Sequence, residues 1–311
     1  MSNRIGIGSG GRIAATLILL LNLIATGFAQ PPASPVKAIS KKPQQTRLRA
    51  RVFQSASLGR PMHYRILLPA KYMDSSRRFP VLYLLHGWHG DYKNWSMLTK
   101  LVKYADSLAI IIVMPDAEDS WYANSATESH DKFETYMVRD VIDDVDLHWR
   151  TLASADQRAI AGLSMGGYGA VKFGLKYSDR FRFVGSLSGA FNATNPELRQ
   201  SRSDLAPSLD AAFGKSRTQM TEEEDIFKFV ETVRSSGSQY FYIDCGTRDS
   251  DFLQANRDFV ALIGQRKFAY EYHETPGDHS WQYWDSRLPN LLDVVTHVLA
   301  GSNSVRNEKG K

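Results

Sequence analysis

The stretch RAIAGLSMGGYGA, residues 158–170, decides the fold class. It carries the pattern Gly-x-Ser-x-Gly, in which Gly162 and Gly166 flank Ser164, and it joins an apolar run to a helix-compatible one. A serine in this pattern occupies a sharp strand-to-helix turn with a strained backbone, where side chains two residues away on either side would collide. The pattern alone is a weak signal, and a passive serine in a glycine-rich turn is the alternative. Its place between strand and helix favours a nucleophile, because the helix N-terminus then stabilises developing negative charge.

The runs around this motif predict an α/β fold. Eight segments have strand character, and helical stretches lie between most of them. The runs Val81–Leu85 and Ala109–Met114 are continuously apolar, which is typical of strands buried on both faces of a parallel sheet. We therefore expect a mostly parallel central sheet with helices on both faces, edged by an antiparallel hairpin of the first two strands. The predicted strands are Ala50–Ser55, His63–Leu68, Val81–Leu85, Ala109–Met114, Arg158–Leu163, Phe183–Leu187, Tyr240–Cys245 and Ala269–Tyr272.

Four segments are predicted to be helices. The clearest is Lys132–Trp149, whose apolar residues recur on one helical face. The others are Glu222–Arg234, Asp251–Gln265 and Trp281–Leu299. The segment between Gly189 and Glu222 is the expected lid. It is too short for a full cap domain, which indicates an open site.

The first 29 residues have the pattern of a secretory signal peptide. Arg4 and Arg12 precede a short apolar run, Ile13–Ile24, and small residues stand at positions −3 and −1 before Gln30. A transmembrane anchor is the alternative, but the run is short for the ~30 Å of a hydrocarbon core. We therefore expect a secreted or periplasmic protein with no stable membrane insertion after cleavage.

Composition and charge describe a globular domain between basic ends. Residues 30–48 are rich in Pro, Lys and Gln and read as a flexible linker, residues 49–299 as the domain, and residues 300–311 as a disordered tail. The chain carries a formal net charge of +5, but residues 1–51 contribute +8 and residues 300–311 contribute +2, which leaves −5 for residues 52–299. This distribution argues against a nucleic-acid partner. A single cysteine, Cys245, excludes an intrachain disulfide framework.

A serine nucleophile needs a base and a carboxylate that orients the base. In α/β-hydrolases these follow the serine in the chain order acid, then histidine. Asp249 lies just past the seventh predicted strand and is the expected acid. Asp251 is the alternative, although it also suits the N-cap of the next helix, and Asp244 inside the strand is expected to be structural. His279, in a Pro/Gly loop before the last helix, is the expected base, with His273 as its alternative.

Backbone N–H groups and aromatic side chains complete the expected site. Acyl transfer needs two donors for the oxyanion, and we expect the N–H groups of Met165, directly after the nucleophile, and Trp88, in the loop after Val81–Leu85. Six aromatic residues fall near strand ends, where their rings could stack on a substrate. For four of the six, packing in the core is the favoured alternative. Those proposed to contact substrate are Trp88, Trp121, Tyr122 and Trp281, and the other two are Tyr283 and Trp284.

Four blocks of sequence resemble a known group. They are VLYLLHGWHGDYKNW (residues 81–95), AGLSMGGYGAVKFGLKYSDRFRFVGSLSGAF (161–191), YIDCGTRDSDFLQANRDF (242–259) and GDHSWQYW (277–284). They resemble the esterase D-like branch of the α/β-hydrolases, most closely its tributyrin-type esterases. The branch includes S-formylglutathione hydrolases, feruloyl and acetyl-xylan esterases, and mycolyltransferases. The resemblance implies Ser164, Asp249 and His279 as a catalytic triad, the N–H groups of Trp88 and Met165 as the oxyanion hole, and an enzyme without a cofactor.

These features predict a secreted serine carboxylic-ester hydrolase. It is expected to act through an acyl-enzyme on short-chain or carbohydrate-linked esters, with an acyltransferase using the same residues as the alternative. A non-catalytic binding module on the same fold is disfavoured, because no expected triad member is missing from the sequence. No grouping of His, Asp and Glu has convincing metal-ligand spacing, so no metal site is expected.

Overall fold

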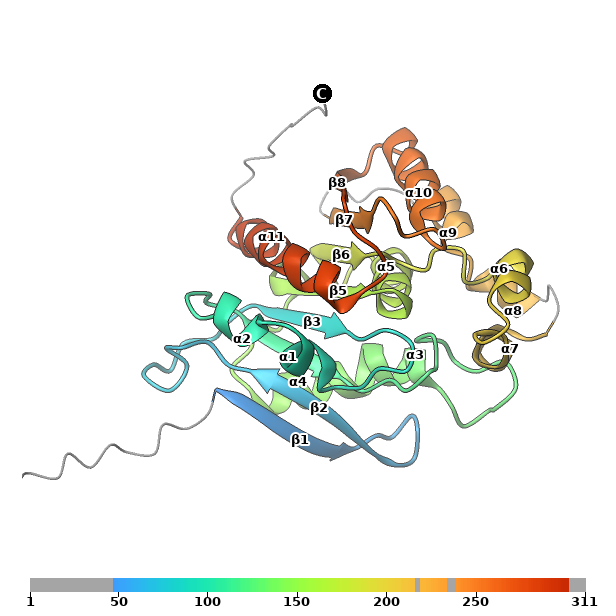
Figure 1. Ribbon diagram of the computed structural model, residues 1–311. Helices are drawn as coiled ribbons and strands as arrows, with labels where there is room; N and C mark the ends of the chain where they lie inside the picture. The colour runs from blue at the N-terminus through green and yellow to red at the C-terminus, as the bar shows by residue number, and fades with distance from the viewer. Residues whose placement is uncertain (1–46, 216–218, 234–238, 302–311) are drawn as a thin grey trace, which may run out of the picture. The chain divides into compact units, whose positions relative to one another are not determined.

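The computed structural model describes residues 47–215, 219–233 and 239–301. The predicted signal peptide, nearly all of the predicted linker, and residues 302–311 of the predicted tail lie outside the described residues. Eight strands form one sheet in the order β1-β2-β4-β3-β5-β6-β7-β8 (Figure 1). The strands are β1 (Leu48–Gln54), β2 (Pro61–Leu67), β3 (Val81–Leu85), β4 (Ile111–Pro115), β5 (Arg158–Leu163), β6 (Phe183–Leu187), β7 (Tyr240–Gly246) and β8 (Ala269–Thr275).

The sheet is parallel except at one edge. Strands β1 and β2 form the predicted antiparallel hairpin, β2 also runs antiparallel to β4, and every other pair is parallel. All eight predicted strands are confirmed, with ends that differ by at most three residues. The largest difference is at β8, which continues through Thr275. The predicted α/β fold is therefore confirmed, and the carboxyl ends of its parallel strands share one edge.

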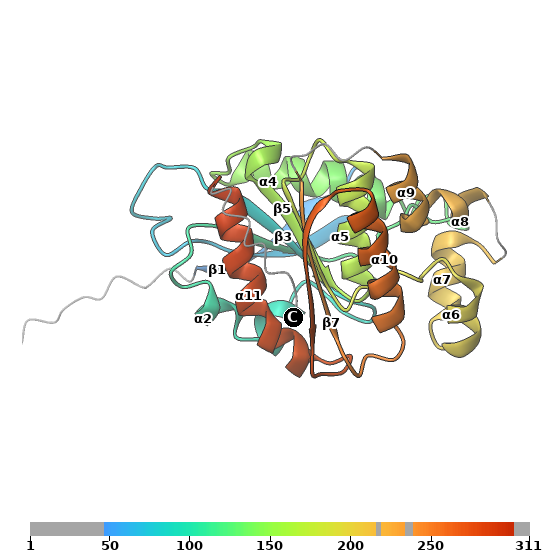
Figure 2. The same cartoon turned by 90° about the horizontal axis from the view of Figure 1, so that it is seen from above.

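Helices cover both faces of the sheet, as the apolar inner strands require. On β4, Ile111 and Val113 enter one core, whereas Ile112 and Met114 enter the other. Helix α11 (Trp281–Leu299) lies on one face with the short helices α1 (Asn94–Leu98) and α2 (Leu101–Tyr104), and α5 (Met165–Lys176) and α10 (Leu253–Gln265) lie on the opposite face (Figure 2). No helix within the described ranges is long and apolar enough to cross a membrane.

Three of the four predicted helices are confirmed. Lys132–Trp149 corresponds to α3 (Phe133–Thr135), a π-helical turn η1 (Tyr136–Val141) and α4 (Ile142–His148) in succession, and α10 and α11 match the last two. The single helix predicted over Glu222–Arg234 is wrong. Helix α8 (Gln219–Glu223) ends, and α9 (Ile226–Thr232) begins after Asp225, whose side chain accepts the Phe227 N–H at 3.0 Å. Position 234 lies outside the described residues.

A buried ion cluster explains this break. Lys172, on α5, is fully buried, and its Nζ donates to Glu134 at 3.0 Å and to Glu224 at 2.6 Å. Glu224 must turn inward at the end of α8 to reach it. Burial raises the pKa of Glu134, but Lys172 and further hydrogen bonds outweigh burial and lower that pKa to about 2. Lys176 contacts the same carboxylates from a position whose side chain is 33% exposed. The cluster therefore joins the α3 and α8–α9 segments to the helix that follows Ser164.

Lys172→Met tests this cluster. It leaves two buried carboxylates without their central cation, so we expect a loss of about 3–5 kcal/mol in the free energy of unfolding, measured in urea. Lys176→Met is the matched control and costs at most about 1 kcal/mol, because its ammonium is partly solvated. Glu134 stabilises the fold above the usual carboxyl pKa of ~4.3, and this contribution is lost as the pH falls toward 2. The free energies of unfolding of the wild type and of Lys172→Met should therefore converge on acidification. Equal losses for both variants at pH 7 would contradict the assignment.

Candidate active site

Ser164 occupies the turn between β5 and α5 with a strained backbone. Its φ is 53° and its ψ is −120°, in a region that non-glycine residues rarely adopt. Two contacts, with the end of β6 and with the segment after it, hold it there: the Ser164 N–H donates to the Leu187 carbonyl at 3.0 Å, and the Ser164 carbonyl accepts the Ala190 N–H at 3.1 Å. The strain therefore lifts the hydroxyl above the carboxyl edge of the sheet.

The two glycines of the motif are required by close backbone approach. A Cβ at Gly162 would lie 2.4 Å from the Gly166 carbonyl group, and a Cβ at Gly166 would lie 2.5 Å from the His86 carbonyl oxygen. The collisions expected from the motif are thus confirmed. The second contact also shows that the turn packs directly against the end of β3, where the loop with Trp88 begins.

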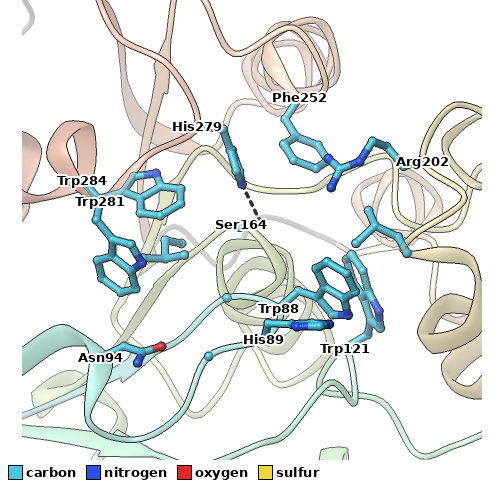
Figure 3. Close-up of a pocket in the computed structure, with 14 residues that line it drawn as sticks. Trp88, His89, Asn94, Trp121, Ser164, Arg202, Phe252, His279, Trp281 and Trp284 are labelled. Atoms are coloured by element: carbon cyan, nitrogen blue, oxygen red, sulfur yellow. Dashed lines mark hydrogen bonds between the residues drawn. The ribbon is translucent and has the colours of Figure 1, made fainter. Parts of the chain in front are cut away.

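A continuous hydrogen-bond chain links three of the predicted residues. His279 Nε2 lies 2.9 Å from Ser164 Oγ (Figure 3). On the other side of the ring, His279 Nδ1 lies 2.8 Å from Asp249 Oδ2. Asp249 is 1% exposed, so its carboxylate favours a protonated Nδ1, which leaves Nε2 free to accept from the serine. The imidazole ring lies between the rings of Phe252 and Trp284, each with a centroid 4.9 Å away.

Backbone hydrogen bonds join the loop that carries Asp249 to the loop that carries His279. The Thr247 N–H donates to the Thr275 carbonyl at 2.9 Å, and the Arg248 N–H donates to the Gly277 carbonyl at 2.8 Å. These bonds continue the parallel pairing of β7 with β8 beyond the strands. Asp249 and His279, 30 residues apart in sequence, are positioned by one extended ladder.

The alternative acid and base lie elsewhere. The Asp251 carboxylate accepts a hydrogen bond from Arg202 at 2.5 Å, and Phe252 rather than Asp251 is the N-cap of α10. His273 lies within β8, with its Nε2 3.6 Å from Glu271. The structure therefore brings neither of them to Ser164.

Asp244 has a structural environment, as its place inside β7 predicted. Its fully buried carboxylate accepts from Arg287 Nε at 2.7 Å and from the Tyr283 hydroxyl, and both donors belong to α11. Since α11 begins two residues after His279, this contact fixes the base loop to the strand that carries the acid. A Cβ at Gly277 would lie 2.1 Å from the Tyr283 ring, so the loop lies flat on this helix.

The loop after β3 passes beside the nucleophile. A Cβ at Gly87 would lie 2.6 Å from the Leu163 side chain and 3.4 Å from Ser164 Cβ. The next residue, Trp88, lines the same pocket as Ser164. Among the described residues, neither the Trp88 N–H nor the Met165 N–H donates to a backbone carbonyl. Both amides therefore remain available to a developing oxyanion.

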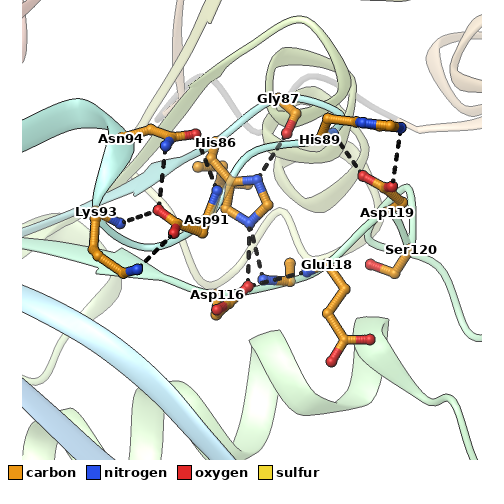
Figure 4. A network of polar contacts seen from close by, with 12 residues as sticks. His86, Gly87, His89, Asp91, Lys93, Asn94, Asp116, Glu118, Asp119 and Ser120 are labelled. Atoms are coloured by element: carbon orange, nitrogen blue, oxygen red, sulfur yellow. Dashed lines mark hydrogen bonds and ion pairs between the residues drawn. The ribbon is translucent and has the colours of Figure 1, made fainter. Parts of the chain in front are cut away.

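His86 fixes this loop through both ring nitrogens. Its Nδ1 lies 2.8 Å from the Gly87 carbonyl oxygen, and its Nε2 accepts the Ala117 N–H at 3.0 Å (Figure 4). Burial disfavours the charged ring and lowers the pKa of His86. The ring is therefore neutral with its proton on Nδ1, which is the form that satisfies both contacts. The Tyr122 hydroxyl adds a third tie by donating to the His86 carbonyl at 2.9 Å.

The pocket above Ser164 has aromatic walls on two sides. Its volume is about 160 Å³. Trp281 and Trp284 lie on one side of the serine, and Trp88 and Trp121 lie on the other (Figure 3). The remaining lining residues are Gly87, His89, Gly90, Asn94, Leu163, Arg202, Leu205, Phe252 and His279.

Three of the four aromatic residues predicted to contact substrate line this pocket, and Tyr122 does not. Tyr122 is fully buried, and its ring fills the space next to Gly169 on α5. Four of the six aromatics near strand ends are buried. Two of these four, Trp121 and Trp284, also line the pocket. The four buried aromatics are Trp121, Tyr122, Tyr283 and Trp284.

The predicted lid supplies part of the wall that sequence reasoning did not assign. Arg202 and Leu205 lie between α6 (Pro196–Ser201) and α7 (Ala206–Phe213), and both line the pocket. Phe252 had a signal, because it follows the predicted acid by three positions. Arg202 had none, since its pairing with Asp251 joins two distant segments. Within the described part of the chain, no group of three or more His, Cys, Asp or Glu side chains is placed to hold a metal ion.

Known proteins resemble this chain over most of its length. An acetyl esterase of Caldicellulosiruptor saccharolyticus is 26% identical over 229 residues, which are 72% of this chain and 85% of the relative. A diacylglycerol acyltransferase/mycolyltransferase, Ag85A of Mycobacterium leprae, is 23% identical over 281 residues, or 80% and 82% of the two chains. A fluorophosphonate-binding serine hydrolase of Staphylococcus aureus has a solved structure that superposes with a TM-score of 0.72. It is 26% identical and covers 80% of this chain and 98% of its own.

A family model places the whole site in one family. The model described as putative esterase matches residues 55–293, a range that includes Ser164, Asp249 and His279. The α/β-hydrolase fold and the resemblance to esterases predicted from the sequence are thereby confirmed. The chain belongs to the putative esterase family.

Proposed function

We propose that this chain is a serine carboxylic-ester hydrolase that acts through an acyl-enzyme. The observation that carries the proposal is the hydrogen-bonded series Ser164–His279–Asp249 at the base of an aromatic pocket. Beside it lie two backbone N–H groups that do not donate to a backbone carbonyl among the described residues. The family supplies the coarser statement, that the chain is an esterase.

Each residue has a defined part in the proposed reaction. Ser164 Oγ attacks the ester carbonyl carbon while His279 Nε2 takes its proton, and the N–H groups of Trp88 and Met165 stabilise the oxyanion. His279 then protonates the departing alcohol, which leaves the acyl group on Ser164. Water enters with the same base and releases the acid. Asp249 holds the imidazole tautomer and stabilises the imidazolium in both halves.

The pocket supports small ester substrates. A volume of about 160 Å³ is close to that of a cavity that accommodates one benzene molecule, ~150 Å³. Short acyl groups or a single ring fit such a space, whereas a long chain has no wall to bury it. Indole faces of the kind that Trp281 and Trp88 provide also stack on sugar rings, which supports carbohydrate-linked esters.

The proposal places this enzyme outside the cytoplasm, in the periplasm or the medium. Its support is the N-terminal sequence alone, in which Arg4 and Arg12 precede a short apolar run that ends before Gln30. N-terminal sequencing of the exported protein checks this part, and a mature chain that begins at Met1 would contradict it.

An acyltransferase is the second candidate. It is favoured by the similarity to a mycolyltransferase over 80% of this chain. The same acyl-enzyme would then pass its acyl group to an alcohol instead of water. Product analysis in the presence of an added alcohol separates the two: a hydrolase releases mainly free acid, and a transferase releases mainly the new ester.

Ser164→Ala tests the nucleophile. We expect kcat to fall by at least three orders of magnitude on a short-chain ester, because the nucleophile and its base act as a unit. The melting temperature should change little, since the hydroxyl contacts only His279 among the described side chains. Steady-state hydrolysis and thermal unfolding measure the two effects. A variant that keeps more than about a tenth of the wild-type rate rules out this serine as the nucleophile.

Asp249→Asn and Asp251→Asn form a matched pair for the acid. Asp249→Asn keeps the shape but favours the wrong histidine tautomer, and we expect a loss of up to about 10⁴ in kcat. Asp251→Asn removes only a partly exposed ion pair with Arg202, so we expect less than a threefold change. The rates of the two purified variants at pH 8 decide the matter, and the reverse order would reassign the acid.

Acyl chain length tests the substrate proposal. Each methylene buried against an apolar wall contributes about 0.8 kcal/mol, or about fourfold in kcat/KM. With no such wall beyond the pocket, we expect kcat/KM to peak at short acyl groups in a series from acetyl to palmitoyl esters of one alcohol. A value that climbs steadily to palmitoyl would overturn the short-chain assignment and favour the transferase.

A further inference from the structure

The helix pair α1–α2 presents a cluster of exposed apolar side chains. Met97, Leu98 and Val102 are 67%, 49% and 38% exposed. The other exposed large apolar residues in the described ranges are Val52, Met73, Leu147, Leu152 and Tyr270, and no three of them lie within six consecutive positions. Isolated apolar side chains are normal on a protein surface, whereas a cluster marks an interaction surface. Three exposed apolar side chains within six consecutive positions therefore indicate a surface that another molecule covers.

The same helix pair is locally cationic. Lys93, Lys100 and Lys103 border the apolar cluster, and no Asp or Glu occurs from residue 92 to residue 105. The side chains of Lys93 and Lys100 are 39% and 67% exposed, and they pair with Asp91 and Asp285. Because residues 52–299 carry a net charge of −5, this face differs in sign from the domain as a whole. Its charge suits an anionic partner.

The basic N-terminal stretch joins the domain beside this face. Arg47, the first described residue, donates to Asp106 at 2.5 Å and to the Ala105 carbonyl at 3.1 Å, directly after α2. The seventeen residues that precede it in the sequence contain three lysines and no acid. Two basic segments are therefore connected at one place on the domain.

We propose that this helix-pair face, defined by Met97, Leu98 and Val102 with Lys93, Lys100 and Lys103, adsorbs to an anionic lipid bilayer. Adsorption to such a surface combines shallow burial of apolar side chains with attraction of cations to anionic headgroups, and this face supplies both. The contact is peripheral and needs no membrane-spanning helix.

The pocket lies next to the proposed contact. Asn94, the first residue of α1, lines the pocket, and the Trp95 ring packs edge-on against Trp281 with centroids 5.5 Å apart. Trp281 in turn contacts Trp284, which packs against His279. Docking would therefore bring the pocket beside the lipid surface. Adsorption itself does not depend on the proposed ester hydrolysis, so the two are tested separately.

A fluorophore at one position tests the contact directly. Met97→Cys carries a polarity-sensitive dye at the centre of the face, and Leu147→Cys carries it at an 80% exposed position on α4. The native Cys245 is buried, and burial raises the pKa of its thiol, so it does not compete for labelling. With the full chain and vesicles of phosphatidylglycerol and phosphatidylcholine, we expect a blue shift at position 97 and none at 147.

Three controls decide between the possible results. Phosphatidylcholine vesicles alone and ~1 M salt should each abolish the shift at position 97. Lys100→Gln with Lys103→Gln should weaken partitioning about 25-fold, at about fivefold per lysine, whereas Lys71→Gln with Lys132→Gln should leave partitioning unchanged. Equal shifts at positions 97 and 147, no shift at either, or an unchanged affinity in the lysine variant overturns the proposal. A shift that grows with protein concentration in the absence of vesicles would assign the face to a second copy of the chain instead.

Discussion

The strained backbone at Ser164 is the constraint on which the site depends. A positive φ at a serine costs free energy and persists only where the surroundings enforce it. Leu187 and Ala190 enforce it through hydrogen bonds on both sides of the residue. The glycines at 162 and 166 make the turn sterically possible, because the second of them packs against the His86 carbonyl. The turn therefore packs directly against the start of the loop after β3, which carries Trp88.

The rest of the site follows from parallel strand order. Strands β3, β5, β6, β7 and β8 are consecutive neighbours and point the same way, so the loops after them lie in a row along one edge. That row brings the Trp88 loop, Ser164, the segment that supports its backbone, Asp249 and His279 together in spatial sequence. The ion pair of Asp244 with Arg287 secures the last member, because it fixes α11 to β7. Residues that are far apart in the chain thus lie close together because of the strand order, and few additional contacts are needed to position them.

Sequence reasoning succeeded where one local signal decides the structure. Apolar runs predicted all eight strands, and loop position after β7 and β8 predicted which acid and which histidine meet Ser164. It failed where a contact with a residue distant in the chain decides the structure. The helix predicted over Glu222–Arg234 breaks because Glu224 turns toward Lys172, some fifty residues earlier in the chain. Tyr122 lies near a strand end like the aromatics that line the pocket. It is buried in the core instead, because Gly169 has no side chain and its place is taken by the Tyr122 ring.

Asp249 and Asp251 show how two like residues acquire different parts. Asp249 is 1% exposed, and its Oδ2 lies 2.8 Å from Nδ1 of the His279 imidazole. Asp251, with a side chain 37% exposed, faces Arg202, whose charge is permanent. The partner of Asp249 is thus an imidazole ring, whereas the partner of Asp251 is a permanent cation. Because Arg202 comes from the segment between α6 and α7, the pair of Asp251 with Arg202 fixes one wall of the pocket to the loop that carries the acid. The short segment Asp249–Asp251 therefore contacts both His279 and the pocket residue Arg202.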